Sequence, residues 1–101
     1  MGLYGNQRLR PIAQGQNTDV DAAAEALTST QLAHGVILKA LEANTDVVYV
    51  NFVETATVAN GYPLGAGDSL GPVPVRDDDL ANISCIGGAV NQAIAWIALG
   101  Y

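Results

Sequence analysis

Positive charge is scarce in this chain of 101 residues, which has four Lys and Arg against ten Asp and Glu and a formal net charge of -6. Proteins that bind nucleic acids need clustered Lys and Arg to displace counterions from the phosphates. Here Arg8 and Arg10 lie near the N-terminus, while Lys39 and Arg76 stand alone. The sequence therefore predicts no direct contact with nucleic acid, and the same charge balance disfavours an anionic membrane surface.

Cysteine and histidine occur only once each, as Cys85 and His34. A lone cysteine excludes an internal disulfide, so folding in a reducing cytoplasm is the simplest expectation. Cys85 lies in an apolar segment without a basic neighbour that would activate it, which favours an inert buried thiol. Nucleophilic hydrolysis needs a Ser, Cys or Thr beside a base, and no serine lies in a GxSxG motif. We expect His34 at the surface, and we predict that the protein is not an enzyme and takes no cofactor.

Long apolar runs are also missing. Residues 81–101 are interrupted by polar residues and glycines, and the N-terminal MGLYGNQRLRPIAQG lacks the apolar centre of a signal peptide. We therefore expect synthesis in the cytoplasm and no membrane partner. Half of the residues are hydrophobic and only 14% are charged, whereas about a quarter is usual. So few charges on a small domain predict apolar surface at interfaces with partner proteins.

Glycine and proline are concentrated in the stretch GYPLGAGDSLGPVPVRDDDL, residues 61–80. The glycines allow positive φ in turns, and Pro72 and Pro74 restrict their segment to the edge of a sheet. In the run Asp77–Asp79, Asp78 or Asp79 is placed to cap a short helical turn. Three adjacent Asp side chains cannot all converge on one Ca²⁺ ion, so we predict no metal site, although a weakly bound cation stays an alternative.

Apolar residues alternate with others along several short segments that are separated by turn residues. This pattern predicts an all-β domain, a small β-sandwich or a jelly-roll-like barrel. We expect the segments 35–41 and 47–53 to form a hairpin, and Asn60-Gly61 is a second hairpin signal. Residues 18–31 are ambiguous between an Ala-rich helix and a small-residue strand, and we favour the strand. The predicted strands are near 20–27, 35–41, 47–53, 68–75, 82–86 and 93–99.

Residues 1–17 have the composition of an extended N-terminal arm, followed by a single β domain over 18–101. Gln, Asn, Gly and Pro dominate the arm, yet bulky apolar residues and two arginines recur in it. We expect the arm to reach an acidic or mixed-charge surface of a neighbouring subunit, so that deleting residues 2–16 would leave the β domain folded and weaken its attachment. The candidate contact residues are Leu3, Tyr4, Arg8, Leu9, Arg10 and Ile12.

From His34 to the C-terminus the chain resembles small virion proteins of tailed bacteriophages. The resemblance rests on the order of GVILKALEANTDVVYVNF, GYPLGAGDSL, RDDDLANISCIGG and AIAWIALGY. Such proteins are generally decoration or cement proteins on the capsid, or minor components near the head. The resemblance therefore implies a structural virion protein on the capsid exterior that stabilises contacts between major capsid subunits. Its expected partners are the major capsid protein and further copies of itself, as a dimer or trimer.

Two other functions fit the same composition. The first is another virion component, such as the base of a head fibre or a part of the connector. The second is a small module that binds glycans or a host surface, which would need Trp96 or several tyrosines exposed on a concave face. Cementing instead predicts that these aromatic side chains are buried or lie at protein interfaces.

Overall fold

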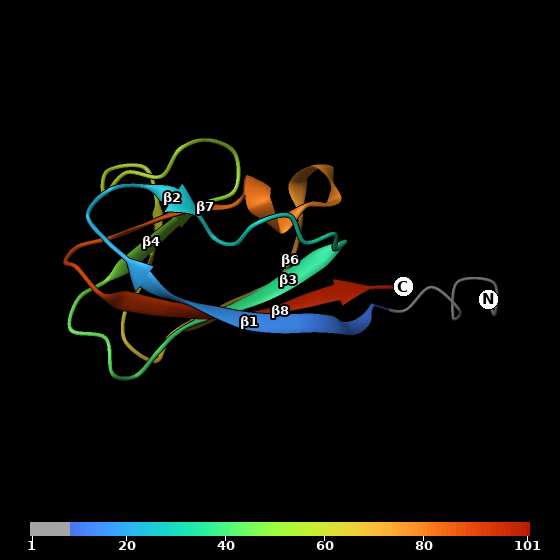
Figure 1. The fold of residues 1–101 in the computed structure, drawn as a ribbon, viewed down its shortest axis with the longest axis horizontal. Coiled ribbons are helices and arrows are strands. Elements are labelled where there is room, and N and C mark those ends of the chain that lie inside the picture. The colour runs from blue at the N-terminus through green and yellow to red at the C-terminus, as the bar shows by residue number, and fades with distance from the viewer. Residues whose placement is uncertain (1–8) are drawn as a thin grey trace.

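The computed structural model of the protein describes residues 9–101 and is a sandwich of two antiparallel four-stranded sheets (Figure 1). Sheet A has the strand order β1-β8-β3-β6, and sheet B has the order β2-β7-β4-β5. Strands make up 51% of the chain and helix 6%, which confirms the predicted all-β class. The strands are β1 (Arg10–Val20), β2 (Glu25–Ala26), β3 (Gly35–Ala40), β4 (Val48–Asn51), β5 (Tyr62–Leu64), β6 (Ser69–Pro74), β7 (Ser84–Gly87) and β8 (Gln92–Gly100).

The core lies between the two sheets and follows from the period of two along the strands. In β3 the side chains of Val36, Leu38 and Ala40 are buried, whereas Ile37 and Lys39 face outward. In β8 the buried positions Ile94, Trp96 and Ala98 alternate with half-exposed ones in the same way. The alternation expected of these segments is thus present in β3 and over residues 92–98 of β8.

The connection from β3 to β4 contradicts the sequence-based prediction of a hairpin over 35–41 and 47–53. β3 belongs to sheet A and β4 to sheet B, so the loop between them crosses the sandwich. The crossing is fixed by β8, because Asn44 exchanges two hydrogen bonds with the main chain of Ala93, both of 2.8 Å. The consecutive strands that do pair are β4 and β5, and the Asn60-Gly61 signal lies in their connection. β5 itself was not among the predicted strands.

Gln92 closes the same loop from the first position of β8. Its side chain is 1% exposed, and its Oε1 accepts hydrogen bonds from the main-chain N–H groups of Thr45 and Asp46, both at 2.9 Å. Its Nε2 donates to Thr45 Oγ1 at 3.0 Å and to the carbonyl of Val90 at 2.8 Å. A buried amide is stable only with its donors and acceptors satisfied, and here each is used. Gln92 therefore joins two crossing loops of the sandwich.

The proline-rich and Asp-rich parts of residues 61–80 have the predicted structural roles. β6 is the outer strand of sheet A and contains Pro72 and Pro74. Asp79 caps the short 3₁₀ turn Leu80–Asn82, because its Oδ1 accepts from the N–H of Ala81 at 2.9 Å. The same Oδ1 accepts from the N–H of Gln31 at 3.1 Å, which ties the approach to β3 to this turn.

Residues 10–27 differ most from the sequence-based expectation. Residues 10–17, which were assigned to the arm, form most of the 11-residue strand β1, and Arg10–Val20 pairs with β8. The strand predicted near 20–27 is instead the end of β1, a turn and the two-residue β2, so its boundaries were wrong. Residues 19–30 contain no helix. The arm therefore does not extend to residue 17, and the β domain begins at or before Arg10.

The buried amide of Gln92 is expected to stabilise the fold strongly. Gln92→Leu keeps a similar volume but leaves the N–H groups of Thr45 and Asp46 without acceptors, so the free energy of unfolding should fall by about 2–3 kcal/mol. Urea unfolding followed by the fluorescence of the single tryptophan measures this change. Gln14→Leu, at an exposed position, is the matched control and should change stability by less than about 0.5 kcal/mol. Equal stabilities of the two variants would contradict the role given to Gln92.

Candidate interaction surfaces

The position of β1 depends on a close contact between Gly15 and Trp96. The two residues are opposite one another in the β1–β8 pairing. A Cβ atom added to Gly15 would lie 2.7 Å from Cζ2 of Trp96, so the indole ring occupies the space that any other residue's side chain would need. Trp96 is only 9% exposed because β1 and the core enclose it. Gly15 is thus a close-approach glycine within a strand, although the sequence analysis placed it in the arm.

The outer edge of β1 is unpaired among the described residues, since β1 is the first strand of sheet A. The main chain of Ala93 bonds toward β3 and its loop, accepting from Leu41 N–H at 3.2 Å and from Asn44 Nδ2 at 2.8 Å. Main-chain groups alternate in direction along an antiparallel strand, so those of Trp96 point the other way, toward Gly15. By the same alternation, the N–H and C=O groups of Gln14 and Gln16 point away from β8 to the free edge.

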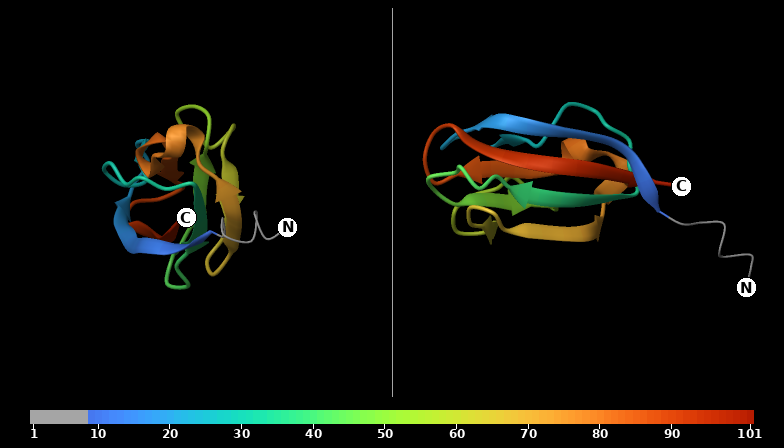
Figure 2. Two further views of the ribbon diagram at one scale, coloured as in Figure 1. Left: turned by 90° about the vertical axis from the view of Figure 1, so that its right-hand side faces the viewer. Right: turned by 90° about the horizontal axis from the view of Figure 1, so that it is seen from below.

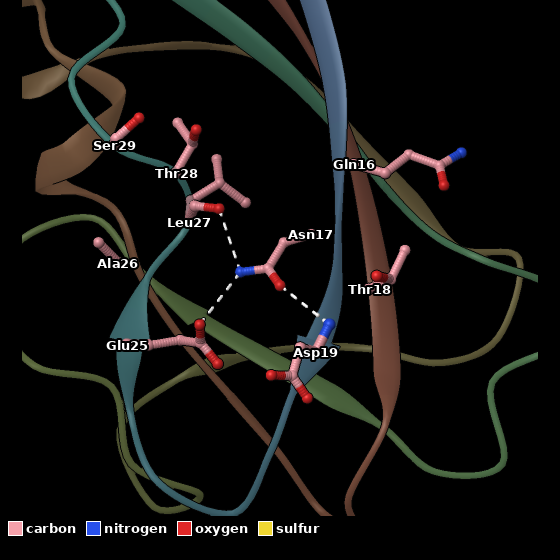
Figure 3. Close-up of a pocket in the computed structure, with 9 residues that line it drawn as sticks. All are labelled: Gln16, Asn17, Thr18, Asp19, Glu25, Ala26, Leu27, Thr28 and Ser29. Atoms are coloured by element: carbon pink, nitrogen blue, oxygen red, sulfur yellow. Dashed lines mark hydrogen bonds between the residues drawn. The ribbon is translucent and has the colours of Figure 1, made fainter.

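A groove of about 550 Å³ runs beside this edge, between β1 and residues 25–29 (Figure 3). The side chain of Asn17 crosses it: its Nδ2 donates to the carbonyl of Leu27 at 3.2 Å and to Glu25 Oε2 at 3.4 Å. Its Oδ1 accepts from the N–H of Asp19 at 3.0 Å. Gln16 points away from the groove in the same view. The groove is shallow and its lining is polar. Its side chains are already hydrogen-bonded across it, so it is better suited to joining β1 to residues 25–29 than to binding a small molecule.

The outer face of sheet A is nearly free of charge. β8 contributes Ala93, Ala95 and Ile97 to this face, all partly exposed. The residues opposite Ile97 are Gln14 on β1 and Ile37 on β3, and the residues opposite Ala95 are Gln16 and Lys39. Lys39 is the one charged residue among these, and it pairs with Glu42 at 3.3 Å. The face is therefore weakly apolar and nearly neutral.

Exposed apolar side chains gather at the end of the sandwich where β1 starts and β8 finishes, and these two strand ends lie side by side (Figure 2). We call Leu9, Ile12, Leu32 and Tyr101 the terminal patch; their exposed fractions are 42%, 48%, 66% and 58%. The last three line a hollow of about 300 Å³ together with His34 and Asp78. The rings of His34 and Tyr101 are 4.7 Å apart and tilted by 50°. Large apolar side chains exposed together are typical of an interaction site.

The opposite end of the sandwich is acidic. This end carries five of the ten acidic residues of the chain, and bonds such as that from Asn91 N–H to Asp21 Oδ1 at 2.9 Å hold its loops together. The basic residue beside them is Lys39, already paired with Glu42. The five are Asp19, Asp21, Glu42, Asp46 and Asp68. The molecule thus has an acidic end, whereas the terminal patch lies at the other end, beside Asp78.

The structure brings together only some of the residues that the sequence marked as partner contacts. Leu9 and Ile12 lie in the terminal patch, and Arg10 is exposed at the first position of β1. Leu3, Tyr4 and Arg8 lie outside the described residues. The sequence analysis missed Leu32 and Tyr101, because exposure at a chain end and in a connection leaves no periodic signal. His34 lines the hollow beside them.

Residues 9–101 contain no group of three or more His, Cys, Asp or Glu side chains arranged to hold a metal ion. Asp77 and Asp78 both have positive φ, of 52° and 55°, and the carboxylate of Asp79 is engaged in capping. In this part of the chain no helix has the length and apolar character needed to cross a membrane.

Comparison of the chain with protein-family models, with curated proteins and with solved structures finds no match.

The close contact at Gly15 predicts a strong effect of adding a side chain there. Gly15→Val should lower the free energy of unfolding by about 1–3 kcal/mol, because the new side chain overlaps the Trp96 ring. Gln16→Val, with its side chain on the outer face, is the matched control and should leave stability nearly unchanged. Urea unfolding curves of the two variants give the comparison. A Gly15→Val protein as stable as the control would show that β1 does not pack against Trp96.

Cys85 is predicted to be unreactive in the folded protein. Burial, and secondly the charge of Glu25, raise the pKa of its thiol from 9.0 to about 12. The thiol is therefore neutral at pH 8, and a thiol-specific aromatic disulfide should label it only after unfolding. Because the folded pKa is raised, the associated stabilisation is complete below pH 9 and declines as the pH rises toward 12. Rapid labelling of native protein at pH 8 would contradict the burial of this side chain.

Proposed function

We propose that this protein is a structural virion component of a tailed bacteriophage, a capsid decoration or cement protein that stabilises contacts between major capsid subunits. The observation that carries the proposal is the terminal patch at one end of a sandwich whose other end is acidic. A decoration protein must bind a particle with one surface and remain soluble on the opposite one. The terminal patch is suited to the first task and the acidic end to the second.

The resemblance to phage virion proteins supports the proposal through the fold. The segments that carry it run from β3 to β8. Several of their polar residues hold turns: Asn44 bonds to Ala93, Asp68 accepts from Gly65 N–H at 2.9 Å, and Asp79 caps a 3₁₀ turn. These residues are needed for the shape of the sandwich, so similar motifs favour a similar sandwich in those virion proteins. The role on the capsid is the part that the resemblance suggests and that an experiment must test.

Burial of the aromatic side chains favours cementing over glycan binding. Trp96 is enclosed in the core and is unable to stack on a sugar ring. Of the tyrosines among residues 9–101, the two exposed ones are Tyr62 on β5 and Tyr101 after the end of β8. The two residues line no shared groove. An aromatic platform for glycans is therefore not present in the described part of the chain.

The role expected for the N-terminal arm needs a revised test. Deleting residues 2–16 would remove most of β1, expose Trp96 and break the pairing with β8. Loss of capsid attachment in that variant would then report unfolding and say nothing of the arm. A deletion confined to residues 2–8 leaves β1 intact and is the appropriate variant.

The terminal patch is predicted to attach the protein to the capsid. Leu32→Glu places a charge in the patch and should lower occupancy on capsids at least about tenfold, since an unpaired charge in an apolar interface costs several kcal/mol. Val90→Glu is the matched control, because Val90 is 61% exposed but lies in the loop that precedes β8, at the acidic end. Occupancy is measured by sedimenting capsids with purified variants whose unfolding curves match the wild type.

Mass spectrometry of purified virions gives the independent measurement. A cement protein should be present in a copy number comparable to that of the major capsid protein. Absence of the chain from virions would overturn the proposal, and a few copies per particle would instead indicate a connector or fibre-base component. Equal occupancy of the Leu32→Glu and Val90→Glu variants would remove the terminal patch as the attachment surface.

A further inference from the structure

We propose that the free edge of β1 pairs antiparallel with the β1 edge of a second copy of this chain, around a two-fold axis near Gly15. The proposal concerns a dimer of the isolated protein and does not rest on a role in virions. It specifies which surface makes the dimer, with which symmetry and through which atoms.

The first argument is a contrast among the four edge strands of the sandwich. Three are protected against pairing: β2 has only two residues, β5 contains Pro63, and β6 contains Pro72 and Pro74. β1 is an 11-residue strand whose one proline, Pro11, lies next to its start. Natural sheets protect exposed edges with short strands, prolines, bulges and charges, because unpaired N–H and C=O groups attract other strands. β1 is the one long edge strand, and its central positions have none of these protective features.

The second argument is the distribution of charge along β1. The strand has a cation at its start, Arg10, an anion near its end, Asp19, and no charged residue between them. Two such strands repel at both ends when parallel and attract at both ends when antiparallel. Within residues 9–101 neither Arg10 nor Asp19 forms an ion pair. Glu25, whose carboxylate accepts a hydrogen bond from Asn17 at 3.4 Å, adds a second negative charge near the end of β1 at which Arg10 of the second copy would arrive. The strand is therefore electrostatically complementary to itself, which identifies a second copy as the partner.

The third argument is the register. Residues Ala13 to Asn17 pair regularly with β8, and the pairing is irregular on both sides of this segment. A two-fold axis through its middle residue, Gly15, places Gln14 of each copy opposite Gln16 of the other. These are the residues whose N–H and C=O groups point to the free edge, so two reciprocal pairs give four main-chain hydrogen bonds. The two-fold arrangement joins the two A sheets into one sheet of eight strands and closes the assembly, as isologous contacts do.

The dimer has a small interface, so we expect a weak, salt-sensitive association. Sedimentation equilibrium of the wild-type protein at low ionic strength should show a monomer–dimer equilibrium that shifts toward monomer as salt is added. Gln16→Pro removes one edge N–H in each copy without removing a bond to β8, and should raise the dimer dissociation constant at least about tenfold. Gln16→Ala, which keeps the N–H, is its matched control and should dimerise as the wild type does.

A charge exchange tests the antiparallel geometry and does not depend on the proline variant folding. Arg10→Asp and Asp19→Arg should each dimerise at least about tenfold more weakly than the wild type, because each creates two repulsive pairs in its own homodimer. Mixed together, the two variants should associate more tightly than either does alone, since every end pair in the heterodimer is attractive. Lys39→Asp, which changes a cation on β3, is the control and should leave the equilibrium unchanged.

Three results would overturn the proposal: a protein that is monomeric at millimolar concentration, a dimer that Gln16→Pro leaves intact in a folded protein, or charge variants that show no preference for each other. These outcomes are independent of capsid occupancy. Failure of the dimer therefore leaves the virion proposal standing, and an absence of the chain from virions leaves the dimer standing.

Discussion

The packing of the Trp96 ring over Gly15 is the constraint on which the arrangement of the surfaces depends. It holds β1 against β8. β1 in turn provides the outer edge of sheet A and leads from the first residues of the terminal patch. Through Asn17, β1 also makes the contact between the two sheets along their open side. A side chain at residue 15 would push these features away from the core together. The contact between Gly15 and Trp96 thus determines which edges of the sandwich are covered by internal contacts. It also determines where main-chain groups stay available for pairing.

Neutral hydrogen bonds hold the remaining loops in place, because the chain has few charges to use. The two ion pairs among residues 9–101 are exposed and contribute little. By contrast, Gln92, Asn44 and Asp79 each bond to the main chain of a segment distant in sequence. No buried side-chain N or O atom in the described part of the chain lacks a partner. Half of the acidic residues lie at the end opposite the terminal patch, where Glu42 forms the ion pair with Lys39.

The sequence was sufficient for the fold class and for most strands, because period-two alternation and turn residues are local properties. The alternation in residues 35–41 indicated a strand, and its face of Val36, Leu38 and Ala40 is the buried one; Pro72 and Pro74 were assigned correctly to an edge. It was insufficient where a residue's role is set by a distant one. Gly15 and Pro11 suggested an arm, since no local pattern within residues 10–17 indicates that Gly15 is paired with Trp96. The β3–β4 turn suggested a hairpin for the same reason. The hydrogen bonds that direct it across the sandwich, those of Gln92 and those between Asn44 and Ala93, join residues more than forty positions apart in the sequence.

The central claim is that residues 13–17 are a strand of the folded domain with one paired and one open side. Amide hydrogen exchange of these residues, measured by NMR in dilute solution at low pH, tests it most directly. The account predicts slow exchange at Ala13, Gly15 and Asn17, which bond to β8, and fast exchange at Gln14 and Gln16, which face the free edge. Equally fast exchange at all five amides would show that this segment is an unpaired arm and would contradict the account.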